Sequence, residues 1–304
     1  MSREPVRLDQ IATEARNPNS ERLDVLTSRE LVTLMCTEDR RCSDAVERAL
    51  PQIARGLDAI VARMERGGRL LYCGAGTSGR LGLLDAVECP PTFSVEPERV
   101  VGILAGGVSA FVTAVEGAED DAELGAADLR ALRLSESDCV VGITASGRTP
   151  YVLGALAEAE RRGALRVAIV CSSDGPVAAR AEIAITLLCG PEVLTGSTRL
   201  KAGTATKMVL NMLSTGAFVR LGKTYSNLMV DVQTTNAKLR ARARHIVALA
   251  TGLSDSAAAQ ALATCGNSVK TAIVATLRNI EPEAARTLLH ASGGRVRPAL
   301  LVAP

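Results

Sequence analysis

Residues 68–80, GRLLYCGAGTSGR, contain the turn that decides the fold, and a second version follows at residues 138–149, DCVVGITASGRT. Each copy is a short apolar strand, then a loop of small and hydroxyl residues that ends in Ser-Gly-Arg, then the expected start of a helix. Glycine lets a backbone approach a ligand closely, and a helix start offers N–H groups at the positive end of the helix dipole. Two such turns on one sheet predict a site for a phosphorylated small molecule.

Apolar runs and helical patterns alternate around these turns, which favours an α/β fold. Strands are expected at residues 69–73, 100–104, 139–143, 166–170 and 182–187. Helices are expected near residues 79–87, 109–114, 119–132, 149–162 and 175–180. Strands that alternate with helices form a parallel sheet covered on both faces. A long helix over residues 200–221 is apolar on most sides and is expected to be buried.

The two ends of the chain differ from this middle part. Residues 1–42 are polar and mixed, although Thr27 and Glu30 can cap a short helix through Met35. Residues 43–66 have apolar side chains at helical spacing, and Gly67 stops that helix. Beyond about residue 240 the strand signals end, and three short helices are expected at residues 254–264, 267–278 and 281–290. We therefore expect an N-terminal segment over residues 1–42, an α/β domain over 43–240 and a small helical domain over 241–304.

Composition narrows the classes of function. Lys and Arg number 35 against 33 Asp and Glu, so neither a nucleic acid nor a membrane is expected as a partner. Trp is absent, and three Tyr and three Phe are too few to suggest stacking platforms for bases. The eight cysteines form no Cys-x-x-Cys pair, so we expect buried reduced thiols and no metal or other cofactor. No signal peptide or apolar run of ~18 residues is visible, which favours a cytoplasmic protein.

Two nucleotide-binding interpretations fail at particular positions. Residues 74–79, GAGTSG, match the dinucleotide fingerprint formally. That fingerprint also requires an acidic residue about 20 positions further on, near the end of the next strand. The expected strand at 100–104 is followed by AGG, which holds no acid. A Gly-x4-Gly-Lys-Ser/Thr sequence is missing as well, which excludes a P-loop nucleotidase.

Three loops carry the hydroxyl and cationic side chains that suit a phosphate. The third, TGSTRLK at residues 195–201, precedes the long helix. Hydroxyl groups donate hydrogen bonds, and an arginine can bind an anion through two of them. We expect these residues to hold the phosphate and the sugar: Ser78, Ser146, Arg148, Thr149, Ser197 and Lys201. The alternatives are ordinary strand-to-helix turns and, for the third loop, a plain cap of the long helix.

Carboxylates near this site could supply acid and base catalysis. Glu88 comes just before Pro90 and Pro91, which are expected to end the helix and stiffen the loop. Residues 116–121, EGAEDD, form an acidic helix start, which the helix dipole also favours without any function. Glu116 and Glu119 have helical i, i+3 spacing, so sequence alone does not choose between them. Two carboxylates at one pocket can divide acid and base roles when their environments separate their pKa values.

Taken together, these segments resemble the N-acetylmuramic acid 6-phosphate etherase family. The matching segments are residues 13–18, 23–24, 68–93, 116–121, 146–151, 195–216, 227–232 and 235–239. They are long and spread over nearly the whole chain, whereas the C-terminal helical region matches more loosely. One departure is Ser94, where the family pattern has glycine, and a serine is strained there if the position needs a positive φ.

The resemblance implies a fold, a reaction and two catalytic residues. The fold is a sugar-isomerase-type, flavodoxin-like three-layer α/β/α domain, in a cytoplasmic homodimer with active sites near the subunit interface. The reaction cleaves the lactyl ether of N-acetylmuramic acid 6-phosphate, without a cofactor or metal, during cell-wall sugar recycling. By motif, Glu88 corresponds to the proton donor and Glu119 to the second catalytic acid.

Two other functions would use the same phosphate loops. A more distant similarity to the glucokinase regulatory protein suggests a non-catalytic sugar-phosphate sensor, but a sensor of that type is expected to be longer, with a second sugar-isomerase domain. A phosphosugar aldose–ketose isomerase would have no use for an acid directed at a C3 ether. Only the etherase requires both Glu88 and Glu119.

Overall fold

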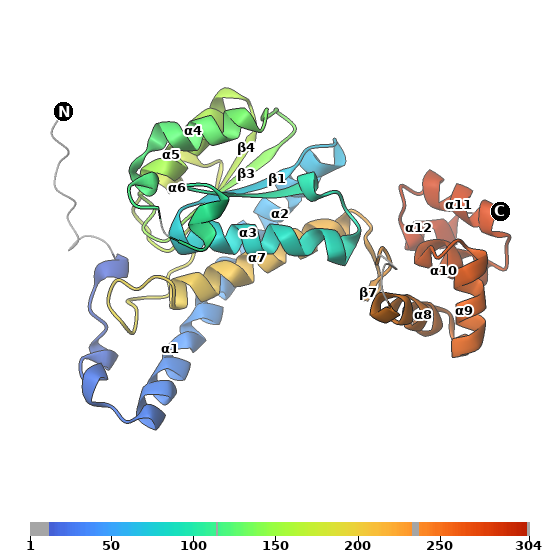
Figure 1. The fold of residues 1–304 in the computed structure, drawn as a ribbon, viewed down its shortest axis with the longest axis horizontal. Helices are drawn as coiled ribbons and strands as arrows, with labels where there is room; N and C mark the ends of the chain where they lie inside the picture. The colour runs from blue at the N-terminus through green and yellow to red at the C-terminus, as the bar shows by residue number, and fades with distance from the viewer. Residues whose placement is uncertain (1–11, 114, 233–236, 303–304) are drawn as a thin grey trace. The chain divides into compact units, whose positions relative to one another are not determined.

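The computed structural model describes residues 12–113, 115–232 and 237–302. Parts of several predictions lie outside the described residues: residues 1–11 of the N-terminal segment, residues 114 and 233–236 of the α/β domain, and residues 303–304 of the helical domain. Residue 114 also belongs to the expected helix 109–114, and residues 235–236 to the last matching segment. The described chain divides into two compact units, one formed by residues up to 87 and 98–214, the other by 88–97 and 215 onward. Figure 1 labels their helices and strands.

The first unit is built on a five-stranded parallel sheet with the order β2-β1-β3-β4-β5. The strands are β1 (Leu70–Gly74), β2 (Val100–Leu104), β3 (Cys139–Thr144), β4 (Leu165–Val170) and β5 (Ile183–Thr186). This is the flavodoxin-like order, in which the direction of winding reverses between β1 and β3. The prediction of a parallel α/β sheet is confirmed, and each expected strand end lies within one residue of its observed position.

Helices cover both faces of the sheet. On one side lie α4 (Ala122–Ala131), α5 (Pro150–Arg161) and α6 (Pro176–Arg180), as Figure 1 shows. On the other lie those parts of α3 (Gly76–Phe93) and α7 (Lys201–Arg220) that belong to the first unit. Glycines permit the closest approaches. A Cβ on Gly102 would lie 2.4 Å from the Cα of Leu83 in α3, and one on Gly142 would lie 2.7 Å from Val152 in α5. The α7 helix is only partly buried, because Met212 and Val219 are exposed.

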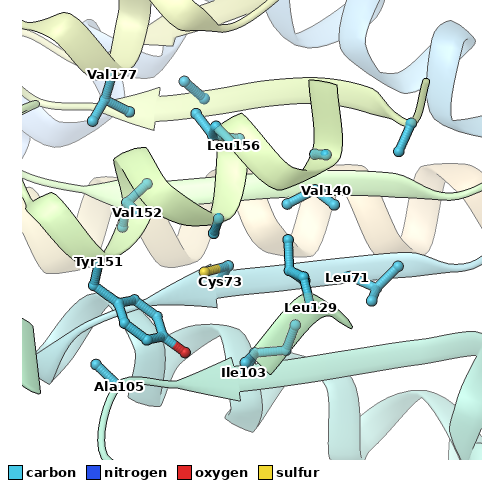
Figure 2. Packing of buried hydrophobic residues seen from close by; sticks show 14 of the residues in the cluster. Leu71, Cys73, Ile103, Ala105, Leu129, Val140, Tyr151, Val152, Leu156 and Val177 are labelled. Carbon is cyan, nitrogen blue, oxygen red and sulfur yellow. The ribbon is translucent and has the colours of Figure 1, made fainter. Parts of the chain in front are cut away.

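The core between the sheet and α4 and α5 is drawn in Figure 2. Side chains such as Leu71, Val140 and Leu156 are fully buried there and come from strands and helix alike. Burying an aliphatic side chain of this size contributes about 1.5–3 kcal/mol each. Tyr151 is the largest member, and its hydroxyl donates a 2.5 Å hydrogen bond to Asp128 of α4. Burial raises the pKa of Tyr151, so the phenol stays protonated as that donor.

The N-terminal helices agree only in part with the prediction. Thr27 and Glu30 form the expected capping box at the start of α1 (Ser28–Arg48), which is longer than the short helix we predicted. The single helix expected over residues 43–66 is wrong: the chain breaks at Ala49, and α2 (Leu50–Glu65) starts there. Pro51 explains the break, because its ring disrupts a helix interior but fits a first turn.

The two prolines after Glu88 do not end their helix. The α3 helix continues through Pro90 and Pro91 to Phe93, so the prediction of a helix end at this point is wrong. The Ser94 amide still donates to the Pro90 carbonyl at 3.0 Å, which closes the last turn. Ser94 has a φ of 48°, the left-handed value that ends many helices and favours glycine. The sequence departs from the family pattern by having a serine in place of glycine at this position. Ser94 therefore adopts the strained, positive-φ conformation that this departure made a concern.

Two expected helices near the sheet are shorter or divided. Residues 108–111 form a 3₁₀ turn, η6 (Val108–Phe111), in place of the helix expected over 109–114. The helix expected over 119–132 is divided into η7 (Ala118–Asp120) and α4. Asp121 separates them, because its side chain accepts from the Leu124 amide and caps α4. Glu116 lies before Gly117, whose φ of 78° turns the chain, so Glu116 and Glu119 do not share a helix face.

The second unit is helical apart from a two-stranded antiparallel ribbon, β6 (Thr224–Tyr225) and β7 (Leu228–Met229). Its helices are α8 (Ala237–Thr251), α9 (Asp255–Thr264), α10 (Val269–Arg278), α11 (Pro282–Ala291) and α12 (Val296–Leu301). The three short helices expected here are α9 to α11. Ser254 and Ser268 cap α9 and α10, and buried residues such as Val247 and Ile273 form a core of its own.

No single described helix combines the length and apolar composition of a membrane span; α8 and α9 meet that test only jointly, across a 106° bend. The cysteine prediction holds for seven of the eight thiols, which are free and buried, whereas Cys36 on α1 is exposed.

Candidate functional site

A polar pocket of about 200 Å³ lies in the first unit where β1 and β3 end. In open parallel sheets, ligands bind beyond the carboxyl ends of the strands at the point where the winding reverses, which here is between β1 and β3. The pocket is lined mainly by small hydroxyl residues and two acids: Thr13, Glu14, Thr77, Ser78, Glu119, Thr144, Ser146, Thr149, Thr198 and Thr206. Four residues predicted for the site, Ser78, Glu119, Ser146 and Thr149, therefore line one pocket.

The first turn brings Ser78 to the pocket through close backbone packing. Ser78 lies in the first turn of α3, directly after β1. A Cβ on Gly79 would lie 2.3 Å from the Gly74 carbonyl oxygen, and no side chain fits at that distance. Gly76 has a φ of 53° and also lines the pocket. The glycines thus let the start of α3 approach the strand end, and helix starts carry N–H groups suited to an anion.

The second turn is fixed by hydroxyl groups as well as by glycine. The Thr144 hydroxyl is 2.7 Å from that of Thr149 and 3.3 Å from that of Ser146. The Arg148 amide donates to the Ser146 hydroxyl at 3.3 Å. Gly147 has a φ of 71°, which places the loop against Gly175. Ser146 and Thr149 consequently converge on the same side of the turn, at the start of α5.

The two arginines of the repeated turn bind the scaffold. Arg80 donates to the carbonyls of Ala110 and Phe111, in the segment after β2. Arg148 donates to the Asp174 carbonyl at 3.0 Å, in the segment after β4. Each guanidinium therefore ties its turn to the loop of the neighbouring strand. Arg148 is exposed and does not line the pocket, which does not fit our expectation of a phosphate ligand.

The third loop is held by buried carboxylates. Glu192 accepts from the backbone amides of Lys201 and Ala202 at 2.9 Å each, so a side chain already occupies the start of α7. The Lys201 ammonium group is fully buried and lies 2.6 Å from Glu38. Lys201 thus faces away from the pocket, and the cap interpretation of this loop fits better than the phosphate one. Ser197 does not line the pocket either, although its neighbour Thr198 does.

Glu38 remains ionised in this buried pair. Burial alone would raise its pKa, but hydrogen bonds from Lys201, Asn19 and Asn17 outweigh burial and lower the pKa to about 2. Removing one partner from such a pair leaves an uncompensated charge in the interior. The network therefore fastens the N-terminal segment to the start of α7.

The acids are distributed unequally around the pocket. Glu119 lines it and also lines a neighbouring hollow of about 190 Å³, whereas Glu116 lines only that second hollow. The sequence alone did not choose between Glu116 and Glu119, whereas in the structure only Glu119 lines the polar pocket. Glu88 lines neither hollow: it is exposed on α3, ten residues after Ser78 in the chain, and belongs to the segment grouped with the second unit.

Sequence reasoning missed Thr13 and Glu14 as pocket residues. They lie in a 3₁₀ turn, η2 (Ala12–Glu14), far along the chain from the glycine-rich turns. No local motif marks them as a site; only their place in the first matching segment could have drawn attention. Thr206, in the second turn of α7, was missed for a similar reason, because it lies inside a pattern that predicts a buried helix.

Other features carry less chemistry. A larger hollow of about 670 Å³ over α5 and α6 is lined by alanines and by charges that pair with one another, such as Glu160 with Arg166 and Arg180. Within the described part of the chain, no group of three or more His, Cys, Asp or Glu side chains is placed to hold a metal ion.

Comparison with known proteins decides the family. The chain is 54% identical over 297 residues to an N-acetylmuramic acid 6-phosphate etherase of Streptomyces avermitilis, covering 98% of this chain and 96% of that protein. The chain belongs to the N-acetylmuramic acid 6-phosphate etherase family. A second etherase, from Photorhabdus laumondii, is 52% identical and covers 97% and 98% of the two chains. The family resemblance proposed from the sequence motifs is confirmed.

Two further comparisons concern the etherase fold. Residues 52–160 match the model of the glucokinase regulatory protein N-terminal SIS domain. Phosphoheptose isomerases from Francisella tularensis and Neisseria gonorrhoeae have similar structures, each with a TM-score of 0.50. They are 21% and 18% identical, and cover 64% and 63% of this chain and 100% and 98% of their own. At such identities the likeness shows the fold alone, and it agrees with the predicted sugar-isomerase-type sheet.

Proposed function

We propose that this protein hydrolyses the D-lactyl ether of N-acetylmuramic acid 6-phosphate to N-acetylglucosamine 6-phosphate and D-lactate. The observation that carries the proposal is a pocket that combines hydroxyl groups, two helix starts and Glu119, in a chain closely related to named etherases over nearly its full length. Such an enzyme is a carbon–oxygen lyase and acts in cell-wall sugar recycling.

The chemistry follows from the substrate. In the open-chain sugar, the lactyl ether at C3 is β to the C1 aldehyde, which acidifies the C2 proton. A base removes that proton, the electron pair forms the C2=C3 double bond, and the C3–O bond breaks. An acid protonates the departing lactate oxygen. Water then adds its hydroxyl at C3 and a proton returns to C2, so two carboxyl groups can serve both halves with their roles reversed.

Within this proposal, the predicted site residues have different tasks. The starts of α3 and α5, with the hydroxyls of Ser78, Ser146 and Thr149, suit the phosphate because they combine N–H and O–H donors with positive dipole ends. Glu119 is one of the two acid–base residues, and Glu88 is the other by its match to the family motif. Arg148, Ser197 and Lys201 are not retained as ligands, since they do not line the pocket. Glu88 does not line the pocket either and is retained on its match to the family motif alone.

We propose, as the family resemblance implied, that the enzyme works as a homodimer with its active sites near the subunit interface, and that it is cytoplasmic. The measurement for assembly is the mass of the purified protein in solution. A mass near twice the 31.7 kDa of the chain supports the dimer, and a monomer that is fully active contradicts it.

The decisive test is enzymatic D-lactate release from N-acetylmuramic acid 6-phosphate. We expect release by the wild type and a loss of about 10²–10⁴-fold in kcat for Glu119→Gln and for Glu88→Ala, the range typical of a lost acid–base group. Glu116→Gln is the matched control, because it removes a neighbouring carboxylate that lines only the second hollow. Circular dichroism and the melting temperature check that the variants fold.

The outcomes also separate the alternative functions. A wild type that binds the sugar phosphate but releases no lactate would support a non-catalytic sensor. Interconversion of an aldose and a ketose phosphate without lactate release would support an isomerase.

A further inference from the structure

The N-terminal turn η2 contributes two residues to the pocket that the proposed mechanism does not use. Thr13 is 4% exposed, lines the pocket, and its hydroxyl oxygen has no hydrogen-bond partner among the described residues. A buried hydroxyl without a partner is unfavourable and is rare in folded proteins. Such a group in a pocket wall indicates a partner that arrives with the ligand.

Glu14 lies beside Thr13 and brings a half-buried carboxylate to the same pocket. The carboxylate lies against Gly196 of the third loop: a Cβ at that position would lie only 2.9 Å from Glu14 Oε2, and Gly196 also has a φ of 76°. The third loop therefore packs closely against this carboxylate through its glycine.

The turn is fastened close to these two residues. The Asn17 side chain donates to Glu38 at 2.9 Å and to the Pro191 carbonyl at 3.2 Å. Glu38 is in turn paired with the buried Lys201, at the start of α7. This network connects the segment after η2 to two other elements of the same unit, so Thr13 and Glu14 are positioned by the fold.

Charge decides which part of a sugar phosphate these residues suit. A carboxylate repels a phosphate but accepts hydrogen bonds from hydroxyl and amide N–H groups. The donors suited to a phosphate belong to the turns after β1 and β3, whereas Glu14 is an acceptor. Resting on the proposed function, we propose that Thr13 and Glu14 bind the hydroxyl or amide groups of the sugar and thereby select a sugar phosphate over phosphate alone.

The test compares two ligands by titration calorimetry: N-acetylglucosamine 6-phosphate, the proposed product, and inorganic phosphate. For Glu14→Gln we expect the Kd for the sugar phosphate to rise about 10-fold or more, as for a lost hydrogen bond to a charged group. The Kd for inorganic phosphate should stay equal or fall, because a repelling charge is removed. Glu21→Gln, an exposed carboxylate in the same segment, is the matched control and should change neither.

Thr13→Val gives a second, independent signature. Valine keeps the shape but removes the unpartnered hydroxyl, so the melting temperature of the free protein should not fall, while the Kd for the sugar phosphate rises about 3- to 10-fold. Thr13→Ser keeps the hydroxyl and should bind within about twofold of the wild type. A merely structural Thr13 would show the reverse: a lower melting temperature with an unchanged Kd.

The inference is overturned if Thr13→Val and Glu14→Gln bind the sugar phosphate as the wild type does, or if both ligands weaken equally. It can also be distinguished from the proposed function. A wild type that releases no lactate, but whose sugar-phosphate binding is weakened by these variants, refutes the etherase and supports the sugar-binding role. If the wild type releases lactate and the variants bind the sugar phosphate as the wild type does, the etherase is supported and the sugar-binding role of Thr13 and Glu14 is refuted.

Discussion

The turns after β1 and β3 and the loop before α7 look alike in sequence, but different forces hold them. All three combine glycine, hydroxyl residues and a cation at or just before the start of a helix. In the two turns, glycine packing and hydroxyl contacts direct Ser78 and Ser146 to the pocket. In the third loop, Glu192 and Glu38 satisfy the helix start and the cation from within the protein.

The difference shows that a hydroxyl-and-cation loop is a candidate anion site only if no side chain of the protein already fills it. A helix start with a carboxylate bound to its amides has no free place for a phosphate. The residues that decide this, Glu38 and Glu192, lie outside the motif and become neighbours only in the fold.

The largest expected effect concerns the charges of the third loop. Glu38→Gln should lower the free energy of unfolding by about 3–5 kcal/mol, because the Lys201 ammonium loses its buried partner. Glu47→Gln, which removes an exposed carboxylate from the same helix, is the control and should cost less than about 0.5 kcal/mol. Urea unfolding at pH 7 measures the free energy of unfolding of both variants. Similar losses for the two would mean that the buried Glu38–Lys201 pair does not hold the third loop in the way proposed.

The same pair predicts a pH dependence. The pKa of Glu38 is lowered in the folded protein from 4.5 to about 2, so the unfolded chain takes up the proton first as the pH falls. The stability that this carboxylate contributes is therefore complete above about pH 4.5 and is lost towards pH 2. We expect the stability difference between wild type and Glu38→Gln to shrink over that window, and a constant difference would contradict the assignment.

Glycine substitutions should destabilise the turn after β1 more than the turn after β3. Gly79→Ala places a Cβ against a backbone carbonyl at 2.3 Å and should cost about 3 kcal/mol or more. Gly147→Ala meets nothing closer than 3.5 Å and should cost only the left-handed backbone strain, about 1–2 kcal/mol. Thermal unfolding of the two variants gives the comparison, and a Gly147→Ala variant as unstable as Gly79→Ala would mean that both turns depend on close packing.

Serine substitutions address binding and should affect both turns alike. Ser78→Ala and Ser146→Ala should each raise the Kd for N-acetylglucosamine 6-phosphate about 3- to 10-fold, the value of one lost hydrogen bond. Ser197→Ala, in the third loop, should leave the Kd within about twofold. Calorimetric titration measures all three, and an effect at Ser197 as large as at Ser146 would restore the third loop as a ligand site.

The smallest effect is expected at the arginines. Arg80→Met and Arg148→Met remove bonds to backbone carbonyls and should change the sugar-phosphate Kd less than about twofold, since neither guanidinium is bound to the pocket. A rise of tenfold or more for Arg148→Met would show that its side chain turns to the phosphate when the ligand binds, as the sequence first suggested.

Much of the fold could be predicted because it depends on local signals. The five strands are short apolar runs between glycine and turn residues, so their positions and parallel arrangement followed from the sequence. The helix boundary at Ala49 and the continuation of α3 through Pro90 were not predicted, because each depends on where a proline falls within a turn of helix.

The candidate site was predictable in part, for the same reason. Ser78, Ser146 and Thr149 follow directly from strand ends, and the ends of parallel strands share one edge of the sheet. Thr13 lines the pocket because the fold brings the N-terminal segment next to residues that are distant in the sequence. Lys201 does not line it, because its ammonium group is paired with the buried Glu38. Neither contact has a signature in the residues next to it.

The distribution of thiols makes the chain suitable for site-selective labelling. Seven of the eight thiols are buried and therefore poorly accessible to a reagent, and burial also raises the pKa of Cys73 and Cys139 and raises that of Cys171 to about 12. Cys36 is exposed on α1, two residues before Glu38. A maleimide fluorophore at Cys36 would then report, without engineering, on whether the N-terminal segment moves when a sugar phosphate binds.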